Sequence, residues 1–152
     1  MQLARFPLLP VVVEEIYRYI CPCSETQKYI IMGRHNELGR LGEEKAAEFL
    51  ENKGYTILAK NYRFGRAEVD IIAANSEHVL FVEVKTRTNY LYGYPEESVG
   101  AKKQRLMSLA ASEFMFQHQL NLSLRFDVIA IFKTKTNEWQ IQHLEDAFFN
   151  YG

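Results

Sequence analysis

Hydrophobic and polar residues alternate along this chain in patterns that predict helices and strands in a definite order. An apolar stripe at helical spacing starts at Leu38, with Asn36 as its N-cap and Gly54 as its stop. Apolar runs bounded by turn residues predict strands on either side of a second helical stripe. The order is helix, three strands, helix and two strands, over about 37–53, 55–62, 67–73, 79–85, 98–119, 122–132 and 138–142.

Both predicted helices contain residues that indicate how the helix packs against the rest of the domain. Gly39 and Gly42 each cost about 1 kcal/mol relative to alanine in a helix, so we interpret them as points where the helix backbone approaches another element. One face of the second helix is expected to point into the core, with Val99, Leu106, Leu109, Ala110, Phe114 and Met115.

This order of elements predicts one α/β domain, a mixed central sheet flanked by helices. A chain of 152 residues suits a single domain with a full core. Residues 1–31 differ from the rest, because Pro7 and Pro10 interrupt their longest apolar run. We therefore interpret 1–31 as an N-terminal extension, flexible or upstream of a natural start near Met32, and 32–152 as the functional domain.

Composition narrows the function only slightly. The formal net charge is −1, so there is no global basic field to attract nucleic acid. No stretch approaches the roughly 20 apolar residues that cross a bilayer, and we expect no membrane partner. Cys21 and Cys23 are the only cysteines, and their spacing is only a weak indication of a metal site. So few cysteines are consistent with a cytoplasmic protein.

Three ionisable residues stand inside apolar strand-like runs, where charge is costly unless it is paired or binds metal. Asp70 lies in the first run, and Glu83 and Lys85 share one face of the second. If the two runs pair, two carboxylates and an ammonium meet. Such a set suits Mg²⁺ and points to metal-assisted hydrolysis of a phosphodiester. The plainer alternative is an ion-pair network.

Five segments carry a family resemblance, in the order LGRLGEEKAA (38–47), FGRAEVDIIA (64–73), FVEVKTR (81–87), VGAKKQRL (99–106) and RFDVI (125–129). Together they resemble the bacterial YraN family of predicted endonucleases, within the PD-(D/E)XK nuclease superfamily and similar to Holliday-junction resolvases. The resemblance covers about residues 32–149. Ala67 stands where the family usually has glycine.

The resemblance implies a restriction-endonuclease-like fold and hydrolysis of branched or structured DNA with Mg²⁺ or Mn²⁺. Asp70, Glu83 and the Val84 carbonyl would hold the metal, Lys85 would orient or deprotonate the attacking water, and Glu43 would reach the site from the first helix. A homodimer is expected by analogy with junction resolvases. The residues expected to contact nucleic acid are Lys102, Lys103, Gln104, Arg105, Arg87 and Arg66.

Other residues and functions stay open on the sequence. Tyr90, Tyr92 and Tyr94 suit either base stacking or packing. Asp127 shares a strand face with Arg125, which predicts a structural ion pair. The histidines show no metal-ligand spacing and are expected at the surface or in turns, at His35, His78, His118 and His143. A non-catalytic nucleic-acid-binding module and a protein-interaction domain remain alternatives, as does RNA as substrate.

Overall fold

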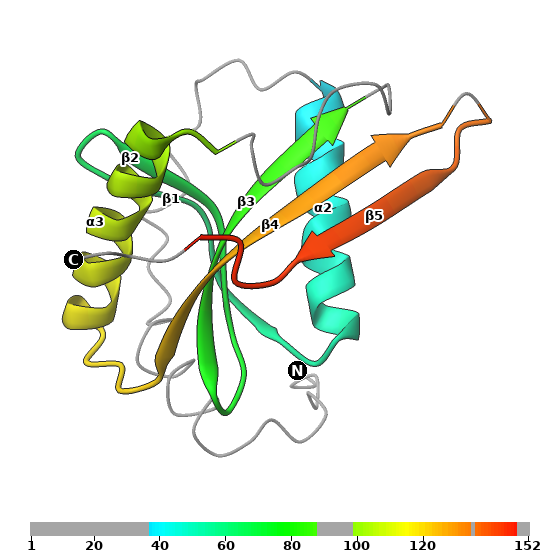
Figure 1. Ribbon diagram of the computed structural model, residues 1–152. Coiled ribbons are helices and arrows are strands. Elements are labelled where there is room, and N and C mark those ends of the chain that lie inside the picture. The colour runs from blue at the N-terminus through cyan, green and yellow to red at the C-terminus, as the bar shows by residue number, and fades with distance from the viewer. Residues whose placement is uncertain (1–36, 88–98, 135, 149–152) are drawn as a thin grey trace, which may run out of the picture.

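Five strands form one mixed sheet in the computed structural model of the chain, which describes residues 37–87, 99–134 and 136–148 (Figure 1). The strands lie side by side in chain order, β1 to β5. All neighbours are antiparallel except β3 and β4, which are parallel and joined by helix α3. The elements are α2 (Glu37–Asn52), β1 (Thr56–Phe64), β2 (Ala67–Ala74), β3 (His78–Arg87), α3 (Ala101–Gln117), β4 (Ser123–Lys133) and β5 (Trp139–Leu144).

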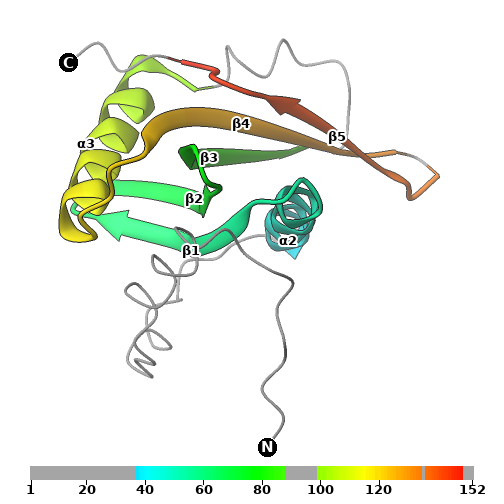
Figure 2. The same ribbon diagram turned by 90° about the horizontal axis from the view of Figure 1, so that it is seen from below.

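The two helices cover opposite faces of this sheet (Figure 2). Successive residues of β3 separate cleanly, because Phe81 packs in the core beneath α3 and Val82 packs in the core beneath α2. The fold is thus a three-layer α/β arrangement compatible with a restriction-endonuclease-like fold, and it confirms the predicted mixed sheet flanked by helices.

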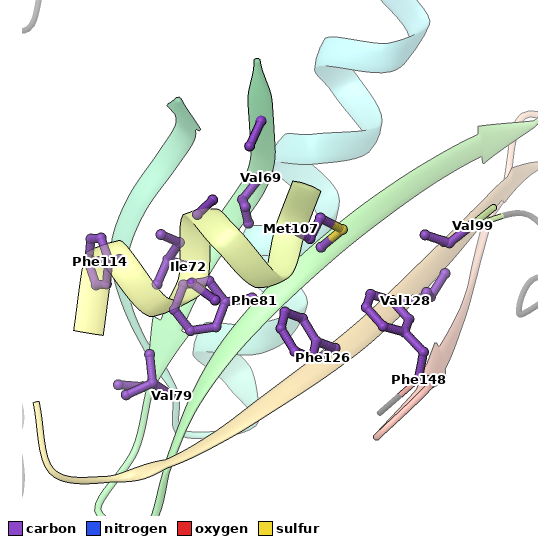
Figure 3. Close-up of a cluster of buried hydrophobic side chains, with 14 residues drawn as sticks. Val69, Ile72, Val79, Phe81, Val99, Met107, Phe114, Phe126, Val128 and Phe148 are labelled. Carbon is purple, nitrogen blue, oxygen red and sulfur yellow. The ribbon is translucent and has the colours of Figure 1, made fainter. Parts of the chain in front are cut away.

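The core under α3 contains four phenylalanines among its aliphatic residues (Figure 3). Phe81 lies between Phe114 of α3 and Phe126 of β4, with ring centroids 5.9 and 6.0 Å away. Phe148, beyond β5, stacks on Phe126 at 4.9 Å. The core under α2 is aliphatic instead, and its fully buried residues include Leu50, Ile71, Leu80, Val82, Ile129 and Ile131. Two dense cores fix the central strands from both sides.

The predicted element order is confirmed, with differences at the ends. Gly54 closes α2 with φ of 88°, and the amide of Tyr55 donates to the carbonyl of Leu50 at 3.0 Å, as in a Schellman motif. Helix α3 is shorter than predicted. The prediction for Leu109 is wrong, since this residue is 54% exposed on the outer face of α3. Asn36 and the extension 1–31 lie outside the described residues.

Gly42 shows why α2 needs a residue without a side chain. A Cβ built there would lie 1.8 Å from Oγ1 of Thr86 on β3, whereas a Cβ at Gly39 meets no described atom within 4 Å. The close-approach interpretation is therefore confirmed for Gly42 and wrong for Gly39 within the described part of the chain. The contact presses the start of α2 against the end of β3.

The two glycines make a matched pair for a stability measurement. Gly42→Ala is expected to lower the free energy of unfolding by about 2 kcal/mol, because the new methyl forces α2 away from Thr86. Gly39→Ala is expected to raise it by up to about 1 kcal/mol through helix propensity alone. Urea unfolding of both variants checks this, and equal effects would contradict the close packing at Gly42.

Within the described residues, neither helix is long and apolar enough to cross a membrane.

Candidate active site

Strands β2 and β3 separate at the position of Asp70. Their pairing ends with Ile71 opposite Val82, so one step further along this register Asp70 faces Glu83. Instead of a backbone pair, Oδ2 of Asp70 accepts a hydrogen bond from the Val84 amide at 2.7 Å. The two apolar runs are neighbouring strands, and the end of their ladder brings the two predicted carboxylates together.

The carboxylate of Glu83 is buried between two ammonium groups. Its side chain is 5% exposed, and its neighbour on the same strand face, Lys85, donates a hydrogen bond from Nζ to Oε1 at 2.7 Å. On the other side, Nζ of Lys103 from α3 lies 2.9 Å from Oε2. Oε2 is buried and accepts no hydrogen bond from the residues that the structure describes, so the contact with Lys103 is an ion pair.

Asp70 is the most perturbed acid of the site. Burial and the negative charge of Glu83 raise the pKa of its carboxyl to about 7, and the charge of Glu43 adds to the rise. The hydrogen bond from Val84 and the charge of Lys103 act in the opposite direction without cancelling the effect. Near neutral pH this carboxyl is therefore easily converted between its acid and its anion, as is common at functional sites.

Glu43 approaches this pair from α2. It follows Gly42, whose contact with Thr86 brings this turn of the helix against β3. Glu43 is partly buried and its charge acts on Asp70. Its neighbour Glu44 is exposed and bound to Arg40 one turn earlier. Of the two helix glutamates, Glu43 is the one near the site.

The residues predicted to contact nucleic acid differ in their exposure and in their contacts. Lys102 and Arg105 are exposed in the first turns of α3, and Arg66 is exposed at the turn between β1 and β2. Gln104 points back along the chain, where its amide donates to the Val99 carbonyl at 2.7 Å. Arg87 is partly buried at the end of β3. Tyr90, Tyr92 and Tyr94 lie outside the described residues.

Lys103 differs from its basic neighbours, and sequence reasoning missed its contact with Glu83. Helical spacing could have predicted that Lys103 points inward, because it lies on the same helix face as the buried residues Met107, Ala110 and Phe114. A lysine at the end of a core stripe can bury its stem and place its ammonium beside a buried acid.

A second buried polar cluster surrounds Asp127. This fully buried carboxylate accepts hydrogen bonds from Nε and Nη2 of Arg125 at 2.9 and 2.8 Å, which confirms the predicted ion pair. It also contacts Nε2 of His143 at 2.8 Å and the Asp146 amide at 3.0 Å. The prediction that His143 is a surface or turn histidine is wrong, since its side chain lies on β5 and is 4% exposed.

The contacts of Asp127 with His143 and with the Asp146 amide join β4 to β5 and to the segment after β5, so we assign the cluster a structural role. Asp127→Ala is expected to lower the free energy of unfolding by about 3 kcal/mol, because it removes the fully buried carboxylate that Arg125 and His143 both contact. Glu145→Ala, which removes the exposed partner of Arg125, should cost less than about 1 kcal/mol. Urea unfolding near pH 7 compares them, and similar small losses would contradict the assignment.

The same cluster sets a direction for acid unfolding. Burial raises the pKa of Asp127, but the hydrogen bonds from His143 and Arg125 outweigh burial and hold the pKa below its ordinary value. Ionised Asp127 therefore stabilises the folded protein at pH values above the ordinary pKa of aspartate. This stabilisation is lost as pH falls through the lowered pKa of Asp127 in the folded state.

The acidic set near Asp70 is small. Among the residues that the structure describes, no group of three or more His, Cys, Asp or Glu side chains is placed to hold a metal ion. Asp70 and Glu83 supply two carboxylates, which resembles the sparse protein ligation of Mg²⁺, a cation that keeps several waters, more than a closed zinc site.

The fold and this cluster define a class: an α/β protein, compatible with the restriction-endonuclease-like fold, with two carboxylates and a lysine where two central strands separate. Comparison with known proteins identifies the family. The model of the uncharacterised protein family UPF0102 matches residues 42–131, and the chain belongs to this family, which is the YraN family.

Relatives from several bacteria have a similar sequence. The UPF0102 protein of Flavobacterium psychrophilum is 42% identical over 120 residues, which cover 79% of this chain and all of the relative. The UPF0102 protein of Bacteroides thetaiotaomicron is 41% identical over 118 residues, covering 78% of this chain and 97% of the relative. That of Flavobacterium johnsoniae is 40% identical over 126 residues, covering 79% of this chain and all of the relative. The family resemblance inferred from the five segments is thereby confirmed.

Proposed function

We propose that the protein is a Mg²⁺- or Mn²⁺-dependent endonuclease that hydrolyses phosphodiester bonds in branched or otherwise structured DNA. The observation that carries the proposal is the meeting of Asp70, Glu83 and Lys85 at the point where β2 and β3 separate. Buried charges are costly to a fold unless they are paired or bind metal, and perturbed ionisable groups cluster at functional sites, which supports the proposal.

The donor set fits a hard divalent cation. Asp70 and Glu83 offer carboxylate oxygens, and Val84, whose carbonyl is the third candidate ligand, follows Glu83 directly on β3. Oε2 of Glu83 is buried and accepts no hydrogen bond from the described residues, and burial together with the charge of Glu83 raises the pKa of Asp70. A bound Mg²⁺ would supply a Lewis acid that polarises the phosphate and acidifies a bound water.

The side chains have separate tasks in this proposal. Lys85 is 30% exposed, so its ammonium can reach a water or phosphate while Glu83 holds its position. It orients the attacking water and stabilises the charge that develops on the phosphate. Glu43 holds the metal site through water from α2. Lys102 and Arg105, three residues apart on the exposed face of α3, bind the DNA backbone.

One observation favours a second candidate function. Both oxygens of Glu83 already face ammonium groups, so the acidic cluster is largely neutralised without a metal. A non-catalytic module that binds nucleic acid through the same surface would have this property. It would bind DNA equally well with metal or with a chelator.

A substrate panel distinguishes these functions. Labelled four-way-junction, flap, single-stranded and duplex DNA, with a matched RNA, are incubated with the protein in Mn²⁺, Mg²⁺ or EDTA. The endonuclease proposal predicts internal cuts in the metals, none in EDTA, and preference for the branched DNA. Binding without cutting in all conditions would shift the assignment to the binding module, and preference for RNA would correct the substrate.

A further inference from the structure

Lys103 occupies a position in the site that differs from that of Lys85. Lys85 follows Glu83 by two residues on β3 and donates a hydrogen bond to Oε1 at 2.7 Å. Lys103 arrives from the first turn of α3, and its Nζ lies 2.9 Å from the other oxygen, Oε2. Oε2 accepts no hydrogen bond from the described part of the chain, so Lys103 is held there by charge.

The charge of Lys103 also reaches the second carboxylate. It lowers the pKa of Asp70 against the effects of burial and of Glu83. One ammonium group therefore acts on both acids, which is the electrostatic role of a cation bound between them. Its side chain is 32% exposed, and a lysine has a flexible four-carbon stem, so the ammonium can leave without unfolding α3.

We infer that Lys103 is an exchangeable counter-ion of Glu83, which leaves Glu83 when a divalent cation binds and then contacts a non-bridging oxygen of the substrate phosphate. The inference rests on the proposed function and adds to it a phosphate-binding residue on α3. Lys85 keeps its place on Oε1, so the two lysines have different tasks. No covalent step is required of Lys103.

Metal binding in the absence of nucleic acid tests whether Lys103 competes with a divalent cation for Glu83. Mn²⁺ is titrated calorimetrically into wild type, Lys103→Met, Lys103→Arg and Lys45→Met near neutral pH, with Asp70→Asn to locate the site. Lys103→Met is expected to bind Mn²⁺ about tenfold more tightly, because the competing positive charge is gone. Lys103→Arg keeps the charge and stays near wild type. Lys45 lies on α2 with its side chain 41% exposed and bound to Glu48, so its variant should match wild type.

The outcomes separate this inference from the proposed function. Mn²⁺ binding that requires Asp70 but is unchanged or weakened in Lys103→Met would overturn the counter-ion role and leave the endonuclease proposal standing. If neither wild type nor any variant binds Mn²⁺, both fail. Thermal unfolding of each variant verifies the fold, and Glu83 retains Lys85 as its partner when Lys103 is replaced.

Binding of a labelled four-way junction, measured in Ca²⁺ and in EDTA, tests whether Lys103 contacts the phosphate once metal is bound. In Ca²⁺, Lys103→Met is expected to bind about tenfold more weakly, with a salt dependence shallower by about one released counter-ion. In EDTA the loss should be under about twofold, because Lys103 is then engaged with Glu83. Equal losses in both conditions would show a fixed phosphate contact and overturn the exchange, and no loss in Ca²⁺ would overturn the phosphate contact.

Discussion

Replacing Lys85 by alanine is expected to slow metal-dependent DNA cleavage by about 10³-fold. Nζ of Lys85 lies 2.7 Å from Glu83 and is part of a side chain that reaches solvent, so it can act on both the site and a bound substrate. Alanine removes this ammonium, while Lys103 in the metal-free protein continues to neutralise Glu83. The fold should therefore persist while the chemical step is lost.

Single-turnover cleavage of labelled branched DNA in Mn²⁺ measures this effect, with Lys45→Ala, a half-exposed lysine paired with Glu48 on α2, as the matched control. The control should cleave at the wild-type rate. Melting temperatures of the two variants should agree within a few degrees, which separates chemistry from folding. A Lys85→Ala rate within tenfold of wild type would contradict the role assigned to this lysine.

Asp70→Asn is expected to stabilise the metal-free protein at pH above about 7. The folded-state pKa of Asp70 is raised from 3.8 to about 7, so the folded protein holds this proton more tightly than the unfolded chain does. Stability contributed by the proton is complete below about pH 4 and is lost as pH rises through about 7. Each pKa unit corresponds to about 1.4 kcal/mol, which makes the penalty on the order of a few kcal/mol. Asparagine avoids this penalty.

Urea unfolding of wild type and Asp70→Asn in EDTA at several pH values checks the sign. The advantage of the variant should be near zero at about pH 4 and should grow until about pH 8. Glu51→Gln, an exposed carboxylate on α2, should show no such trend. Added Mn²⁺ should stabilise wild type and leave Asp70→Asn unchanged. A variant less stable than wild type at about pH 8 would contradict uncompensated charge at Asp70.

Much of the site follows from local pattern. Ionisable residues within two apolar runs, joined by a short turn around residues 75–77, require neighbouring antiparallel strands, and that pairing places Asp70 beside Glu83. The side-chain amide oxygen of that turn's Asn75 accepts from the amides of Glu77 and His78, the expected chemistry of such a turn. Here sequence and fold agree because the contacts are close along the chain.

The features that sequence reasoning missed depend on contacts between distant segments. Lys103 meets Glu83 only because α3 crosses over the sheet between parallel strands. His143 is buried because β5 and the segment after it close around Asp127. Leu109 continues an apolar helical pattern, yet the described part of the fold leaves it exposed. Periodicity indicates which residues can face a core, and tertiary packing decides which of them do.

Metal-dependent cleavage at Asp70 and Glu83 is tested most directly with a labelled four-way junction, wild type and Asp70→Asn, each in Mn²⁺ and in EDTA. Wild type is expected to cut in Mn²⁺ alone, with no product from Asp70→Asn although that variant is folded and stable. Cutting that persists in EDTA or in Asp70→Asn would contradict a metal-dependent site at Asp70 and Glu83. A wild type that binds the junction without cutting it in Mn²⁺ would contradict catalysis itself.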